Sequence, residues 1–229
     1  MAKVCKFGGS SLANGEEFKQ VKKIILLDKE RTTIVVSALG KDKEDDNKVT
    51  DLLYLIYQHR KYHVDAKPLF DMVRDRYLKI EKELALSLNL EIEFDALWKK
   101  IEHDEIDEDE LVSRGEFFSA KLMANYLGFD FVDSKDLIHF NYDGKVLEKE
   151  TKESIEHASS LHSKMVVPGF YGSYPNKKIC LFSRGGSDVT GSYMAKGIKA
   201  ELYENFTDVS GFYMADPRIV ANPRRISQI

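Results

Sequence analysis

The sequence contains little that would place this chain outside the cell or in a membrane. Its 229 residues include only two cysteines, Cys5 and Cys180, with no C-x-x-C motif and no histidine at a zinc-binding spacing. We therefore expect two reduced core cysteines in a cytoplasmic protein, since disulfides are typical of oxidising compartments. No apolar run approaches the roughly 20 residues of a membrane-spanning helix. The amino terminus has no signal-peptide pattern.

An excess of positive charge is also missing. The chain has 34 Lys and Arg against 38 Asp and Glu, a formal net charge of −4, which disfavours non-specific binding to nucleic acid. A protein of this charge that handles phosphate must concentrate its cations locally. The motifs of Walker phosphate loops, dinucleotide-binding turns, protein kinases, zinc hydrolases and α/β-hydrolases are absent as well. Hydride transfer and zinc or serine hydrolysis are therefore disfavoured.

Strand–helix–strand patterns occur near both ends of the chain. Asn14 and Glu17 form a capping box that predicts a helix to about residue 28. Residues 32–38 are β-branched and apolar on both faces, which is typical of a strand buried in a parallel sheet. Further strands are predicted at 129–133, 165–167, 179–182 and 200–205, helices at 151–162 and 189–197, and a hairpin connection at 170–177. The fold class is therefore α/β, and we expect one domain over residues 1–229.

Helix-forming residues dominate between these two parts, from about residue 50 to residue 127. Apolar residues at steps of three and four predict helices near 50–62, 67–87, 91–103 and 109–127. This block is an insertion relative to a minimal βαβ repeat. The sequence does not choose between a lid and a dimer surface for it.

Two glycine pairs follow predicted strands, in the segments Lys6–Ser11 and Ser183–Asp188. Glycine pairs let backbone N–H groups approach an anion, and each pair has a cation beside it, Lys6 or Arg184. Ser187 is a predicted N-cap of the next helix. Because parallel strands end at one edge of a sheet, both turns are expected to face one crevice. The alternative is two tight turns with Arg184 as a surface cation.

Three further segments are open to two interpretations. Ser113 and Glu116 form either a capping box or part of a substrate site. Thr50 is either an N-cap or a substrate ligand. Residues 207–218 either clasp a nucleotide or form a surface loop.

Taken together and in this order, the segments 6–13, 113–116, 184–188 and 207–211 resemble those of aspartokinases, members of the amino-acid kinase family. Residues 48–53 and 216–220 extend the resemblance. It implies a three-layer αβα sandwich with a mostly parallel central sheet and a helical insertion. The implied activity is ATP-dependent phosphorylation of the β-carboxylate of L-aspartate, the first step of lysine, threonine and methionine biosynthesis.

The resemblance also implies roles for individual residues. Lys6 contacts the transferring phosphoryl group, and Asp188 orients Lys6. Aspartate is bound by Thr50, Ser37, Glu116 and Arg184. The nucleotide is bound by Gly8, Gly9, Ser10, Thr207, Asp208, Tyr213 and Arg218. Mg²⁺ bridges the phosphates of ATP, so no metal site made only of protein ligands is expected.

Relatives of this family continue beyond Ile229 into the rest of the kinase domain and into regulatory ACT domains. We therefore expect an incomplete kinase domain without ACT domains, and its activity is an open question. One alternative is a related amino-acid kinase with another acidic acceptor. Another is a catalytically silent fragment that binds nucleotide or a partner chain. ATP and L-aspartate are the expected partners, with neither nucleic acid nor membrane, and formation of a homo-oligomer stays open.

Overall fold

The computed structural model describes residues 2–183, 185–207 and 220. Within that part of the chain a five-stranded sheet forms the centre, in the order β3-β4-β2-β1-β7. Each neighbouring pair in this sheet is parallel, so the strands end at the same edge. The strands are β1 (Lys3–Phe7), β2 (Arg31–Val36), β3 (Asp130–Phe131), β4 (Met165–Pro168) and β7 (Leu202–Phe206).

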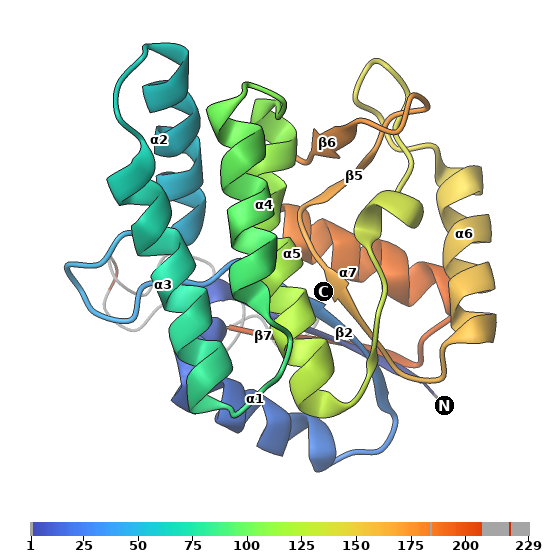
Figure 1. Cartoon of the computed structure of the whole chain (residues 1–229). Coiled ribbons are helices and arrows are strands. Elements are labelled where there is room, and N and C mark those ends of the chain that lie inside the picture. The colour runs from blue at the N-terminus through green and yellow to red at the C-terminus, as the bar shows by residue number, and fades with distance from the viewer. Residues whose placement is uncertain (1, 184, 208–219, 221–229) are drawn as a thin grey trace.

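Helices cover both faces of this sheet (Figure 1). One face carries α1 (Gly15–Leu26), α2 (Val49–Lys61), α3 (Lys67–Glu83), α4 (Leu90–Glu102) and α5 (Glu108–Leu127). The other carries α6 (Glu148–Leu161) and α7 (Gly186–Gly197). Alternate strand residues serve the two layers: Cys5 packs with the first group of helices, and Val4 packs with the second. The predicted three-layer α/β fold is therefore confirmed.

The predicted helix α1 has the expected cap. The side chain of Asn14 accepts a hydrogen bond from the backbone N–H of Glu17 at 3.0 Å. The helices of residues 50–127 also lie where periodicity predicts them, with one difference. Helix α3 ends at Glu83 rather than near residue 87, because Ala85 adopts a left-handed conformation with φ of 53°.

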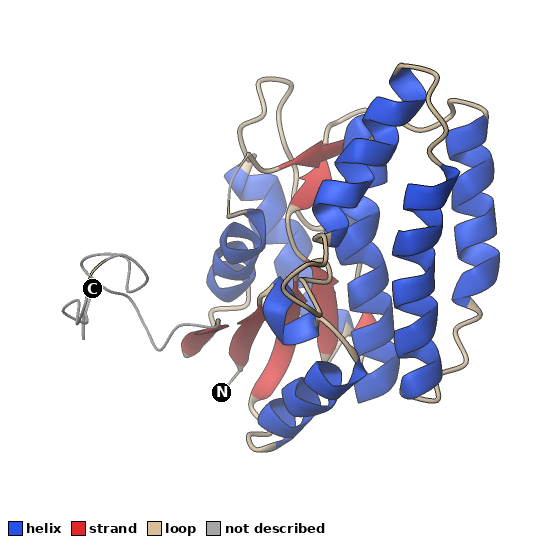
Figure 2. Cartoon of the chain, turned by 90° about the vertical axis from the view of Figure 1, so that its left-hand side faces the viewer, coloured by secondary structure: helices blue, strands red, loops and turns tan. Residues whose placement is uncertain are grey.

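The helical block forms part of the sandwich itself. Helix α5 packs directly on β2, β3 and β4, and α2, α3 and α4 pack around it (Figure 2). Aromatic rings fill the space between these helices. Phe94 of α4 stacks on Phe118 of α5, with ring centroids 4.2 Å apart. Helix α5, the last helix of the predicted insertion, is therefore part of the helix layer that packs on the sheet.

Residues 179–182 correct one expectation. Strand β6 (Ile179–Leu181) pairs antiparallel with β5 (Tyr171–Ser173) in a separate two-stranded sheet, so it does not extend the parallel sheet. The tight turn between them, with Lys177 at φ of 68°, folds the second strand back on the first. A short apolar run alone does not distinguish these two pairings.

Two short 3₁₀ helices lie among the described residues: η1 (Gly9–Leu12), directly after β1, and η2 (Ser134–Asp136).

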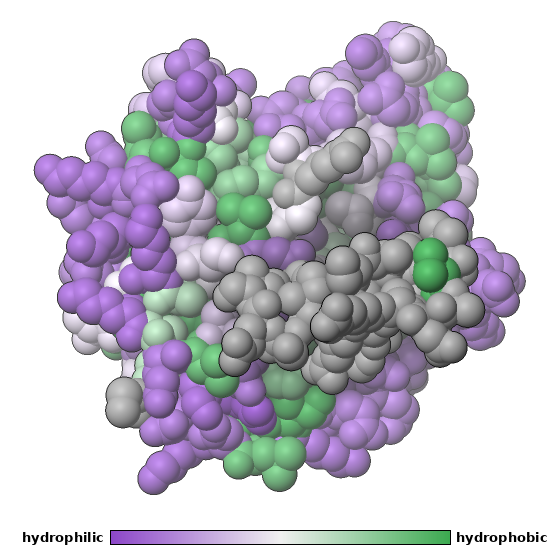
Figure 3. Space-filling view, turned by 180° about the vertical axis from the view of Figure 1, so that it is seen from behind, coloured by the Kyte–Doolittle hydropathy of each residue, from purple (hydrophilic) through white to green (hydrophobic). Residues whose placement is uncertain are grey.

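Seen from behind, hydrophilic side chains cover much of the described surface, and apolar side chains form separate patches (Figure 3). No helix among the described residues combines the length and the apolar character needed to span a membrane.

Candidate active site

A cavity of about 700 Å³ opens where β1 and β2 end. The loops after these strands form part of its wall, and the first turn of α2 and the middle of α5 contribute one residue each. Seven of the residues that the sequence assigns to ligand binding line it: Gly8, Gly9, Ser10, Ser37, Thr50, Glu116 and Thr207. The crevice expected at the carboxyl edge of the sheet is therefore present.

Lys6 is held in place by an ion pair beside this cavity. Its Nζ lies 2.9 Å from Oδ1 of Asp188, in the first turn of α7. The lysine side chain is 10% exposed and that of the aspartate 49%. The amide of Asn205 donates to the same aspartate oxygen at 3.0 Å, and the β1–β7 register places Asn205 beside Lys6. Three elements, β1, β7 and α7, thus fix one ammonium group.

The turn after β1 brings this ammonium to the cavity. A Cβ atom on Gly8 would lie 3.6 Å from Lys6 Nζ, so the charge lies beside the glycine pair. The N–H of Gly8 donates to the carbonyl of Phe206 at 3.4 Å, and η1 begins at Gly9. The amide of Gly8 is therefore engaged by β7, which corrects the expectation that both glycine amides face a phosphate.

Gly9 and Gly40 join the first loop to the second. The N–H of Gly40 donates to the carbonyl of Gly9 at 2.8 Å. A Cβ on Gly40 would lie 2.5 Å from the carbonyl carbon of Gly9, closer than van der Waals contact permits. The loops after β1 and β2 pack backbone to backbone, which requires glycine at this position.

Replacing Gly40 with alanine is expected to lower the free energy of unfolding by ~1–3 kcal/mol, because the added methyl group forces the two backbones apart. Urea unfolding measures the effect. Gly8→Ala is the matched control, since Gly8 has φ of −75° and ordinary contact distances of 3.6 and 3.9 Å. Equal stability of the two variants would contradict the steric argument.

Glu116 presents a buried carboxyl group to the cavity. The residue is 4% exposed, and its Oε2 has no hydrogen-bond partner among the residues that the structure describes. Burial raises the pKa of Glu116 to about 8, although hydrogen bonding with the backbone of Ala38 opposes the shift. A buried, incompletely paired carboxyl is costly, so its position in the cavity wall indicates that a ligand completes its bonding.

The capping interpretation of Ser113 and Glu116 is wrong. Helix α5 begins at Glu108, and Asp107 caps it by accepting a hydrogen bond from the N–H of Glu110 at 3.0 Å. The acidic run upstream therefore supplies the cap, and Glu116 lies well inside the helix.

Two other predicted N-caps also differ. Helix α7 begins one residue before Ser187, because Gly185, with φ of 57°, takes the capping position. Helix α2 has Lys48 as its N-cap, so Thr50 is the second residue of the helix and lies in the cavity wall.

Four predicted site residues, Arg184, Asp208, Tyr213 and Arg218, lie outside the described residues. Sequence reasoning missed three others that the structure brings to the site: Asn205, Lys41 and Lys48. Asparagine is uncommon inside strands, so Asn205 in a predicted strand was an available signal. The roles assigned to the predicted residues remain predictions. Within the described ranges, no three His, Cys, Asp or Glu side chains gather to hold a metal ion.

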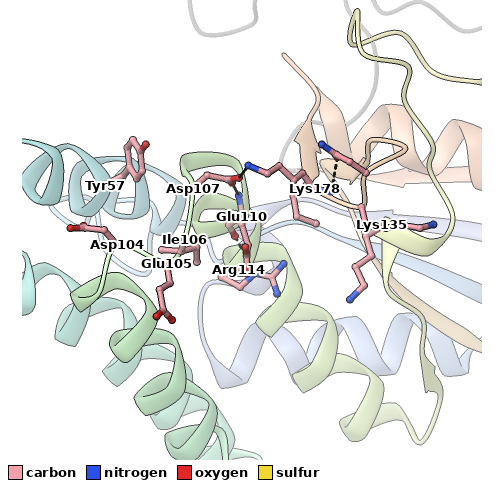
Figure 4. A pocket seen from close by; sticks show the side chains of 12 residues that line it. Tyr57, Asp104, Glu105, Ile106, Asp107, Glu110, Arg114, Lys135 and Lys178 are labelled. Carbon is pink, nitrogen blue, oxygen red and sulfur yellow. Dashed lines mark hydrogen bonds and ion pairs between the residues drawn. The ribbon is translucent and has the colours of Figure 1, made fainter.

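A second cavity, of about 680 Å³, lies between the start of α5 and the β5–β6 hairpin (Figure 4). Several of its charged groups are paired with other side chains, among them Lys178 with Asp107 at 3.7 Å and Glu110 with Lys100 at 3.0 Å. Arg114 lies over the ring of Phe117, 4.4 Å from its centroid. This cavity offers no buried, unpartnered group comparable with Glu116.

Comparison with known proteins agrees with the geometry at the sheet edge. Residues 1–229 match the model of the Amino acid kinase family. The chain is 36% identical to aspartokinase 3 of Bacillus subtilis over 240 residues, which cover 99% of this chain and 53% of that protein. The structure of aspartate kinase from Clostridium acetobutylicum superposes with a TM-score of 0.90 at 44% identity, covering 97% of this chain and 51% of that one.

The fold is also that of Escherichia coli aspartokinase III in complex with aspartate and ADP, with a TM-score of 0.82 at 24% identity, covering 99% of this chain and 53% of that one. The chain spans about half the length of these relatives. The resemblance to aspartokinases found in the sequence is thus confirmed. Because the family model matches the chain over residues 1–229, and the parallel sheet ends at one cavity, the chain belongs to the amino acid kinase family.

Proposed function

We propose that this chain transfers the γ-phosphoryl group of ATP to the β-carboxylate of L-aspartate, forming 4-phospho-L-aspartate for lysine, threonine and methionine biosynthesis. The observation that carries the proposal is the unpartnered Oε2 of Glu116 in the same cavity as the Gly8–Gly9 turn beside Lys6. One wall offers an acceptor for an ammonium group, and another offers a cation for phosphate. The relatives named aspartokinase support aspartate as the acceptor.

The chemistry requires positioning more than proton transfer. A β-carboxylate has a pKa near 4 and is ionised at pH 7, so no general base is needed to activate it. Lys6 stabilises the charge on the transferring group, and Asp188 and Asn205 keep Lys6 aimed at it. Glu116 accepts the ammonium group of aspartate, and Thr50 and Ser37 lie in the same wall.

The site fits a metal that arrives with the nucleotide. Its described carboxylates are Glu116, which is buried in the wall, and Asp188, which is paired with Lys6. Mg²⁺ bound to ATP would neutralise phosphate charge, and Asp188 is the carboxylate nearest to Lys6 that can approach it through its exposed side.

An ADP-release assay with three acceptors tests this function. We expect aspartate to support turnover, whereas N-acetylglutamate, which lacks an ammonium group to pair with Glu116, is expected to fail. Glutamate has the same α-ammonium group but a side chain one methylene longer, so its acceptor carboxylate is displaced and turnover is expected to be much slower.

Two outcomes would support the alternatives. Faster ADP release with glutamate or N-acetylglutamate would indicate an amino-acid kinase with another acceptor. Calorimetric binding of ADP and aspartate without turnover would indicate a catalytically silent chain.

A further inference from the structure

Two consecutive residues of α3, Arg76 and Tyr77, contact the backbone behind the wall of the candidate active site. The loop after β2 supplies Ser37, Ala38, Leu39 and Gly40 to this wall, and α5 supplies Glu116. Arg76 donates to the loop, and Tyr77 donates to the residue that precedes Glu116. Neither Arg76 nor Tyr77 lines the cavity itself.

Tyr77 holds the part of α5 that carries Glu116. The residue is fully buried, and its hydroxyl donates to the carbonyl of Gly115 at 2.7 Å. The same hydroxyl lies 3.4 Å from Oγ of Ser119, one turn further along α5. Gly115 immediately precedes Glu116, and a Cβ on Gly115 would lie 2.8 Å from Cβ of Ala38. The Tyr77 hydroxyl thus anchors α5 at the residue that packs against the loop after β2.

Arg76 holds the next part of the same loop. Its guanidinium donates to the carbonyl of Gly40 and, at 2.9 Å, to the carbonyl of Asn47. These two carbonyls lie on either side of the charged segment 41–46. Gly40 is also the residue whose N–H donates to Gly9, so Arg76 acts on the contact between the two loops.

We infer that Arg76 and Tyr77 are positioning residues, which hold the acceptor-side wall at the geometry that Glu116 requires. The inference rests on the proposed function for the identity of the acceptor. This role differs from both a lid and a dimer surface: helix α3 supports the wall of the site from behind. Because the hydroxyl and the guanidinium act through backbone groups, the wall is fixed without their entering the cavity.

The variants Tyr77→Phe and Arg76→Ala test the inference. Tyr77→Phe keeps the ring in its contacts with Phe94 and Phe118 and removes only the hydroxyl. We expect Tyr77→Phe to raise the Kd for aspartate about 5- to 10-fold, the effect of one lost hydrogen bond, and Arg76→Ala, which loses two, to raise it at least as much. The Kd for ADP should change by less than about twofold. Calorimetry with each ligand measures both.

Each variant has a matched control away from the cavity. Thr151→Val removes a buried hydroxyl that accepts from the N–H of His139 at 3.0 Å, in the opposite helix layer. Arg60→Ala removes a guanidinium that donates to the carbonyls of Ile101 and Glu102 at 3.0 and 2.9 Å. Both controls should lose stability as the test variants do, yet bind aspartate with unchanged Kd. Equal Kd values in test and control variants would overturn the inference.

Backbone amide exchange separates this inference from the proposed function. With no ligand present, residues 38–40 should exchange about tenfold faster in Tyr77→Phe and Arg76→Ala than in the two controls. If the unmutated chain binds no aspartate, the proposed acceptor is wrong, and the exchange result alone decides whether α3 holds the wall. Unchanged exchange at residues 38–40 would refute the inference that α3 holds the wall.

Discussion

Replacing Lys6 with alanine is expected to lower kcat about 10²–10³-fold while changing the Kd for ADP much less. The expected size is that of removing one preorganised electrostatic donor from an active site. Lys6 is firmly held: the residue as a whole is 8% exposed, and its Nζ lies 2.9 Å from Oδ1 of Asp188. A group held in this way contributes mainly when charge develops on the phosphoryl oxygens, so its loss affects turnover more than nucleotide binding.

The control for this variant lies on the same strand. Lys3 is at the opposite end of β1, where its Nζ pairs with Asp28 at 2.7 Å, and Lys3→Ala should leave kcat unchanged. Lys6→Ala is expected to fold, because the aspartate it leaves behind is 49% exposed and stays solvated. Steady-state ADP release and calorimetry on both variants make the comparison. Turnover of Lys6→Ala within about threefold of the unmutated chain would exclude Lys6 from the chemistry.

Replacing Glu116 with glutamine is expected to stabilise the free protein at alkaline pH and to weaken aspartate binding about 10²-fold, within the range for truncating one partner of a buried charge pair. The pKa of Glu116 is raised to about 8 by burial. The folded protein therefore binds this proton more tightly than the unfolded chain does. The associated stability is complete below the ordinary pKa of 4.5 and is lost as the pH rises through 8.

Glutamine is neutral at every pH, so the variant does not suffer this loss. Its stability relative to the unmutated chain should rise by ~2–4 kcal/mol between pH 5 and pH 8.5. Urea unfolding at both values measures the difference. Aspartate binding at pH 7 should also release protons from the unmutated chain and none from Glu116→Gln, which calorimetry in buffers of different ionisation enthalpy detects.

Glu204 provides a control of opposite sign. Its pairing with Arg31, at 2.7 Å, lowers the pKa of Glu204. The stability from this pair is present above the ordinary pKa and is lost as the pH falls, so Glu204→Gln should be least stable relative to the unmutated chain near neutral pH. If Glu116→Gln showed the same pH dependence as Glu204→Gln, the carboxyl of Glu116 would be ionised in the free site.

The parallel sheet and its helix layers were predictable because their signals are local. The capping box at Asn14 and the β-branched run ending at Val36 specify an element from adjacent residues alone. The hairpin connection at 170–177 was predicted, but residues 179–182 were expected in the parallel sheet, because a short apolar strand carries no information about its partner.

Residues of the candidate site were predictable where a family motif contains them. They were less predictable where contacts between distant segments determine which residues reach the site. Glu116 was recognised, but its burial depends on how closely Gly115 approaches Ala38 across the fold. The same applies to Tyr77 and Asn205, whose contacts join segments distant in sequence. No pattern within α3 marks Tyr77 as different from the other buried residues of its apolar face.

The pairing of β1 with β7 also determines when the site can form during synthesis. These strands are joined by groups 199 residues apart, as between Cys5 and Glu204. A ribosome delivers β1 well before β7, so Lys6 cannot pair with Asp188 or lie beside Asn205 until those later residues have been synthesised. Until then one edge of β1 is unpaired and open to other nascent chains. The pairing that places Lys6 beside Asn205 thus joins the two strands of the described sheet that lie farthest apart in sequence, and such long-range pairings form slowly.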